Sequence, residues 1–104
     1  MNNIFESIPT EIPNEIFTDL VTGENIRVER ILSKGQTSPE NGWYDQDENE
    51  WVMVLKGEGT ITFDDGHNIC LQEGDFITIP KHKKHKVSRT DPNHVTVWLA
   101  IFYK

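Results

Sequence analysis

Two histidines and one glutamate are the side chains best suited to chemistry in this sequence. His82 and His85 stand three residues apart among four lysines, within the stretch GDFITIPKHKKHKVSR (74–89). Glu50 ends an acidic loop and directly precedes the apolar run WVMVLK (51–56). Imidazole and carboxylate groups bind divalent metals and also act as acid and base in enzymes. These three residues are therefore candidates for a functional pocket, and the alternative for each is an exposed polar position.

The chemistry of Glu50 depends on whether its side chain faces inward. A buried carboxylate needs a cation, a hydrogen-bond donor or a proton, because an unpaired buried charge costs several kcal/mol. A metal ion or a protonated His85 would meet this need. Without a metal the two side chains form an acid and base pair, in which the carboxylate raises the imidazole pKa towards neutrality. Four aromatic residues either line such a pocket or pack in the core or a subunit interface: Trp43, Tyr44, Trp51 and Trp98.

Short strands separated by turns must position these residues. Pro80 ends the β-branched run 76–79 because proline cannot donate to a sheet ladder. The continuous apolar run 51–56 predicts a strand that is buried on both faces, and Asp64-Asp65-Gly66 predicts a hairpin turn. Many short strands at regular spacing are typical of a β-sandwich or barrel. The expected strands are 26–33, 51–56, 60–63, 68–72, 76–79, 85–90 and 95–103.

The residues before this strand-rich region predict a short helix. Pro13 suits a first helical position, the apolar residues 16, 17 and 20 share one helical face, and Gly23 would end the helix. We expect an N-terminal extension over residues 1–25 that packs across an open end of the domain or against a second subunit. One β-domain then follows over residues 26–104.

Composition and charge limit the function. The 104 residues are 36% hydrophobic and carry a net charge of −7, which disfavours nucleic acids and anionic membranes as partners. No secretion signal and no apolar run of about 20 residues is present, so we expect a cytoplasmic protein. Cys70 is the one cysteine, which excludes a disulfide within the chain, and its alternating segment predicts a buried, inert thiol.

The order of strands and turns resembles the cupin superfamily of small jelly-roll barrels, in particular its small single-domain members of the second type. The second cupin motif has a glycine, five residues, a proline and then a short loop to a histidine, which matches Gly74, Pro80 and His85. The later part of the first motif has a glutamate and, seven positions on, a glycine, which matches Glu50 and Gly57. The resemblance implies an all-β, jelly-roll barrel (double-stranded β-helix), here with a short N-terminal helix.

The resemblance covers about residues 26–103. This sequence, however, lacks the two histidines of the first motif. Counting back from Glu50 places either Tyr44 and Gln46 or Trp43 and Asp45 at their positions. Cupins with the full motif hold a divalent metal through three histidines and one glutamate. The resemblance therefore implies one weakly held iron, manganese, zinc or nickel ion. Its expected ligands are Gln46, Glu50 and His85, and the expected ligand-binding neighbours are Tyr44, Asp45 and His82.

His82 occupies the place where the family usually turns this loop with glycine. Histidine tolerates left-handed backbone better than most residues, so a structural reason is enough to explain it. An added ligand or a pocket base is the other interpretation.

Three functions remain open from the sequence. We expect a pocket protein that binds a divalent metal, a small polar ligand or both, and that forms a homodimer through an edge strand or the N-terminal segment. The first alternative is a metal-dependent dioxygenase or isomerase of small molecules. The second alternative is a non-catalytic structural or partner-binding domain. The fold alone cannot choose among them, because one barrel hosts many activities.

Overall fold

The computed structural model describes residues 2–104, which form eight strands and no helix. Each of the seven strands that the sequence predicts is present, and three of them have the predicted bounds. The strands are β1 (Ile16–Thr22), β2 (Ile26–Ser33), β3 (Asn49–Lys56), β4 (Gly59–Phe63), β5 (Asn68–Leu71), β6 (Phe76–Ile79), β7 (His85–Thr90) and β8 (Thr96–Tyr103). None of these residues forms a helix that is long and apolar enough to cross a membrane.

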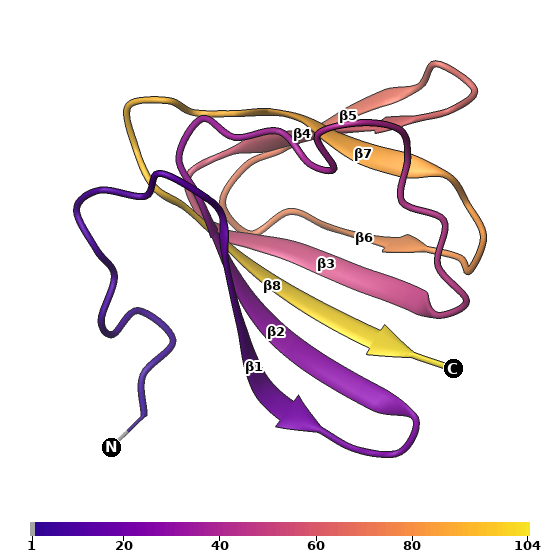
Figure 1. Ribbon diagram of the computed structural model, residues 1–104, viewed down its shortest axis with the longest axis horizontal. Coiled ribbons are helices and arrows are strands. Elements are labelled where there is room, and N and C mark those ends of the chain that lie inside the picture. Colours follow the sequence, from indigo (N-terminus) through magenta and orange to yellow (C-terminus); the bar gives the residue numbers. More distant parts are fainter. Residues whose placement is uncertain (1) are drawn as a thin grey trace.

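The strands form two antiparallel sheets. One sheet has five strands in the order β1-β2-β8-β3-β6, and the other has three in the order β5-β4-β7. Figure 1 shows β4, β5 and β7 gathered on one side of the molecule, with the long strands β2, β8 and β3 forming the layer beside them. Four of the neighbouring pairs join strands that are not consecutive in sequence, as in a jelly roll: β2–β8, β8–β3, β3–β6 and β4–β7. This arrangement confirms the predicted all-β, cupin-like barrel.

The core lies between the two sheets and is filled by alternate residues of the strands. Successive side chains of a strand point to opposite faces, so Val52 and Val54 of β3 face inward together with Trp98, Ala100 and Phe102 of β8. Residues of the smaller sheet close this cluster from the other side: Ile61, Phe63 and Leu71. The outward positions of β3 are only half-buried. The expectation that both faces of this strand are buried was therefore wrong.

The predicted N-terminal helix is also wrong, because the segment forms β1. This strand pairs with β2 in the register Ile16↔Leu32 to Thr22↔Arg27, with an irregularity between Asp19 and Val21. Ile, Phe, Thr and Val favour strands, and the open edge of β2 supplies the hydrogen bonds that an isolated short helix would lack. The apolar spacing that suggested a helical face is thus compatible with a bulged edge strand.

The segment before β1 covers the outer face of the larger sheet. Ile12 is buried against Leu32 of β2 and Val97 of β8. Both partners lie next in sequence to residues that face the barrel, Ile31 and Trp98, so they point to the opposite face. The N-terminal residues therefore extend the core beyond the barrel.

Cys70 differs from the prediction of a buried thiol. It lies on β5 and is exposed to solvent. In this short outer strand only Leu71 is fully buried, so alternation places the thiol on the solvent face.

Candidate functional site

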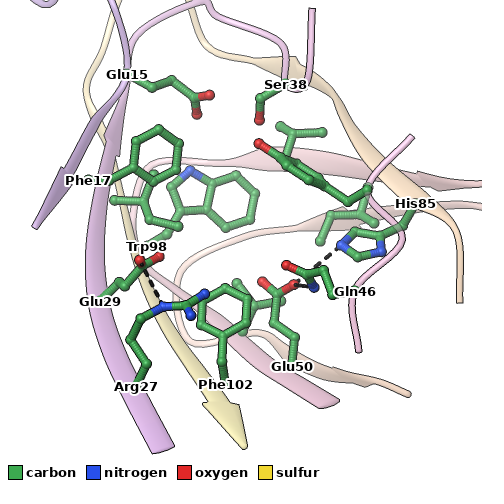
Figure 2. A pocket seen from close by; sticks show the side chains of 15 residues that line it. Glu15, Phe17, Arg27, Glu29, Ser38, Gln46, Glu50, His85, Trp98 and Phe102 are labelled. Carbon is green, nitrogen blue, oxygen red and sulfur yellow. Dashed lines mark hydrogen bonds and ion pairs between the residues drawn. The ribbon is translucent and has the colours of Figure 1, made fainter. Parts of the chain in front are cut away.

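A cavity of about 320 Å³ opens between the two sheets. Its lining comes from the start of β1, from β2, β3 and β8 of the larger sheet, from β4 and β7 of the smaller sheet, and from the loop before β3. Figure 2 shows two groups of polar side chains on opposite sides, with Trp98 and Phe102 between them. Gln46, Glu50 and His85 form one group, Arg27 and Glu29 form the other, and Glu15 lies apart from Arg27 and Glu29, on the side of Ser38.

Glu50 and His85 form a buried ion pair on the first side. His85 Nε2 lies 3.3 Å from Glu50 Oε1, and the two side chains are 5% and 10% exposed. The Gln46 amide Nε2 donates to the same Glu50 oxygen at 3.2 Å. The structure therefore brings together the three residues predicted from the sequence as a ligand set.

The backbone fixes the orientation of the His85 ring. Nδ1 lies 2.8 Å from the Lys83 carbonyl oxygen, which can only accept, so Nδ1 carries a hydrogen. Nε2 then shares a proton with the Glu50 carboxylate. Burial lowers the pKa of His85, but the hydrogen bonds with Glu50 and the Lys83 carbonyl outweigh it and raise that pKa above its ordinary value of 6.5. The pair can thus donate a proton from the imidazolium and accept one at the carboxylate.

Three segments of the chain meet to build this side of the cavity. Glu50 is the second residue of β3 and faces inward, as do Val52 and Val54. His85 is the first residue of β7, and its backbone exchanges two hydrogen bonds with Tyr44, of 2.8 and 3.1 Å. This pairing holds the loop before β3 beside the smaller sheet.

Tyr44 lines the cavity beside His85, with ring centroids 5.6 Å apart. Burial is the largest cause that raises the pKa of Tyr44, and the carboxylates of Glu15, Glu50 and Glu29 raise it further. A hydrogen bond with Ser38 opposes this change. The phenol therefore stays protonated at neutral pH and offers a hydroxyl rather than a phenolate to the cavity.

The opposite side of the cavity carries charged residues of β2. Arg27 Nε donates to Glu29 Oε2 at 3.2 Å, and the guanidinium lies 4.2 Å from the centre of the Phe102 ring. Burial raises the pKa of the Glu29 carboxyl, although Arg27 opposes this effect. Glu15 accepts a hydrogen bond of 2.6 Å from the Ser33 hydroxyl.

Sequence reasoning missed the residues on this side. The segment IRVERILS predicted a strand, without an assignment of which face points inward. In the structure Arg27 and Glu29 line the cavity, whereas Ile26 is 43% exposed. Glu15 lay in the wrongly predicted helix. The one sequence signal for these residues was the charged side chains at alternate positions of 26–33. That pattern indicates a functional face only once a cavity is known to lie beside the strand.

Asp45 and His82 lie outside this cavity. They pair with each other at 2.8 Å, and both side chains are substantially exposed. His82 has a φ of 62°, in the left-handed region, and its amide donates to the Gln46 carbonyl at 2.7 Å. The structural interpretation of His82 as a turn residue explains its place. Two alignments of the first motif were considered, one with Tyr44 and Gln46 and one with Trp43 and Asp45. Only the residues of the first alignment line the cavity.

The residues present do not fit the metal centre that the family resemblance implies. Within residues 2–104, no three histidine, cysteine or acidic side chains gather in a way that could hold a metal ion. Glu50 and His85 supply two strong donors. Gln46 adds only a neutral amide, and Tyr44 adds a protonated phenol, which are weak ligands for iron, manganese, zinc or nickel. This donor set does not support a tightly held metal.

Comparisons with known proteins agree on the fold. The family model for the cupin domain matches residues 28–102. None of the curated proteins matches the chain in sequence. A solved structure from Ralstonia eutropha JMP134, of a protein provisionally named a mannose-6-phosphate isomerase, is 37% identical with a TM-score of 0.94, over 100% of this chain and 97% of that one.

Two further solved structures share less sequence. A cupin superfamily protein from Desulfitobacterium hafniense DCB-2 is 20% identical, with a TM-score of 0.77, over 92% of this chain and 83% of its own. An RmlC-like cupin protein from Desulfovibrio desulfuricans is also 20% identical, with a TM-score of 0.76, over 98% of this chain and 94% of its own. At this identity the likeness is one of fold.

Proposed function

Since this chain belongs to the cupin superfamily, with its cupin domain over residues 28–102, we propose that its barrel is a binding pocket for a small polar ligand. The observation that carries the proposal is the buried Glu50–His85 pair on the wall of an open cavity of about 320 Å³. A buried ion pair contributes little net stability compared with apolar packing, so its presence beside a cavity favours a role in binding. Pockets of this kind combine an apolar lining with a few polar groups that fix the ligand.

An isomerase is a second candidate, supported by two observations. The Glu50–His85 pair offers both an acid and a base to a bound molecule, which is what moving a proton between neighbouring carbon atoms requires. The 37% identical protein carries a mannose-6-phosphate isomerase name. Glu50 would accept the proton and His85 would return it. Assays of aldose and ketose interconversion, with the Glu50→Gln enzyme as the blank, test this candidate.

The binding test uses substitutions on the polar wall. Glu50→Gln and His85→Ala each remove one charge of the pair, and Asp45→Asn is the matched control, because Asp45 is an exposed carboxylate outside the cavity. Wild-type protein is first screened by thermal shift against neutral sugars, sugar phosphates, amino sugars, small acids and the four divalent metals. We expect at least one organic compound to bind, and its affinity to fall at least tenfold in both wall variants, because truncating one partner of a buried charged pair usually costs about 2–5 kcal/mol.

The outcomes of this screen separate the alternatives. Binding that survives both wall variants would show that the pocket is elsewhere. About one metal per chain, lost in both variants, would instead favour the metal-dependent alternative. Circular dichroism of each variant establishes that a loss of binding is not a loss of fold.

We also propose a homodimer that forms through β1. This strand is an edge of the larger sheet, and Phe17, Leu20 and Val21 on it are each at least 45% exposed. An apolar edge strand with free backbone groups pairs readily with another strand. Antiparallel pairing of β1 with its own copy closes around a twofold axis and leaves no free edge there.

A further inference from the structure

We propose that the cavity selects a small organic ammonium ion, with its cationic group beside Glu15 and its remaining part towards the Glu50–His85 pair. This inference rests on the proposed function of the cavity as a ligand pocket and specifies the class of ligand. It comes from the charges of the lining and from the aromatic rings between its two sides.

The charged residues of the lining do not balance. Three carboxylates face the cavity, those of Glu15, Glu29 and Glu50, against the two basic side chains of Arg27 and His85. Even with His85 protonated the lining has a net charge of −1, since two positive charges oppose three negative ones. Loss of the His85 proton makes the lining more negative. An anionic ligand such as a sugar phosphate therefore meets repulsion at the walls.

The two cations of the lining are already engaged, which leaves one carboxylate of the lining without a cationic partner. Arg27 donates to Glu29 at 3.2 Å and also to Glu48 at 3.3 Å, and His85 is paired with Glu50. Within residues 2–104, Glu15 forms no ion pair, and its hydrogen-bond donor is the Ser33 hydroxyl at 2.6 Å. A ligand ammonium group would supply the missing positive charge and its hydrogen bonds.

The apolar lining near Glu15 also suits a cation. Figure 2 shows Phe17 and Trp98 between Glu15 and the lower part of the cavity, on the side away from His85. Trp98 is held in place because its indole N–H donates to the Ser33 hydroxyl at 3.2 Å, which in turn donates to Glu15. Aromatic ring faces attract ammonium groups electrostatically while packing against the apolar part of the ligand.

The test compares three probes that share a benzyl or phenyl ring and differ in charge. Benzylamine is a cation at neutral pH, benzyl alcohol is neutral and benzoate is an anion. Each is titrated into the whole ¹⁵N-labelled protein at pH 7, with the Trp98 indole and Tyr44 amide signals as reporters. We expect benzylamine to bind at least tenfold more tightly than benzyl alcohol, and benzoate to bind most weakly.

A matched pair of variants assigns the effect to Glu15. Glu15→Gln keeps an oxygen that accepts from Ser33 but removes the charge, and Glu11→Gln makes the same change at an exposed position outside the cavity. We expect Glu15→Gln to weaken the binding of benzylamine roughly tenfold and to leave the binding of benzyl alcohol unchanged. Glu11→Gln should change neither affinity.

Two results overturn the inference while leaving the pocket intact: benzoate binding as tightly as benzylamine, or an unchanged benzylamine affinity in Glu15→Gln. If none of the three probes shifts the reporter signals of the wild-type protein, the proposed binding pocket itself is contradicted.

Discussion

At the residue scale, the state of His85 follows from its two neighbours. The Lys83 carbonyl fixes the hydrogen on Nδ1, so Nε2 faces Glu50 either as a donor or as a bare lone pair. The second state places a lone pair against a carboxylate, which is unfavourable. The pKa of His85 is therefore raised, which means that folding favours the imidazolium.

This coupling predicts a pH dependence of stability. Because the pKa of His85 is higher in the folded protein than its ordinary value of 6.5, the folded state binds the proton more tightly than the unfolded state does. The stabilisation is fully present below pH 6.5 and is lost as the pH rises through the folded pKa. The wild-type protein should therefore have a higher free energy of unfolding than His85→Gln at low pH, and this difference should shrink as the pH rises through the folded pKa. Urea unfolding of both proteins from pH 5.5 to 9 measures it.

The difference in unfolding free energy between the two proteins is the quantity to measure, since they share every other ionisable group. A constant difference across this range would show that folding does not raise the pKa of His85 and would contradict this prediction.

At the element scale, β4 of the smaller sheet passes close to the Trp98 indole of β8. Gly59 begins β4, and a Cβ atom at this position would lie far inside van der Waals contact with Trp98 Cζ2. Glycine therefore allows β4 to cross the indole closely, and the indole in turn lines the cavity.

A substitution at this contact should destabilise the fold through overpacking. We expect Gly59→Ala to lower the free energy of unfolding by about 1–3 kcal/mol, because the indole is buried and cannot move freely. Trp98→Phe removes the Cζ2 and Cη2 atoms that the new methyl group would meet. Gly59→Ala should thus lower the free energy of unfolding less in the Trp98→Phe background than in the wild-type background. Equal costs in a denaturant-based double-mutant cycle would contradict this packing explanation.

At the scale of the whole molecule, the two edges of the larger sheet are both apolar. Val21 on β1 is 55% exposed and Phe76 on β6 is 59% exposed. Phe76 contacts Trp51 of the neighbouring strand, with ring centroids 5.3 Å apart, so part of its apolar surface is already covered. The β1 edge has three exposed apolar residues in one strand and is the better surface for a second copy.

The proposed dimer can be tested at these two edges. Val21→Lys places a charge on β1 and should convert a dimer into a monomer in sedimentation velocity, whereas Phe76→Lys should leave the dimer intact. A monomeric wild-type protein would contradict the proposal outright. Dissociation by Phe76→Lys alone would move the interface to β6.

The sequence by itself determined the strands and the first side of the pocket. Turn residues and β-branched runs are local signals, so seven strands were predicted and Pro80 correctly ends β6. The spacing of Gly74, Pro80 and His85, together with Glu50, identified the family and therefore the histidine and glutamate that the barrel brings within 3.3 Å.

Tertiary structure decided the rest, because each remaining feature depends on contacts between distant segments. The segment that becomes β1 carries an ambiguous apolar pattern, and the open edge of β2 resolved it in favour of a strand. The sequence predicted the strand 26–33 but not that Arg27 and Glu29 face inward, since charged side chains point into a barrel only where an open cavity exists. The pairing of Tyr44 with His85 likewise selected Gln46 over Asp45 as the residue that reaches the pocket. Local sequence patterns specify strands, but only the closed barrel determines which faces share a cavity.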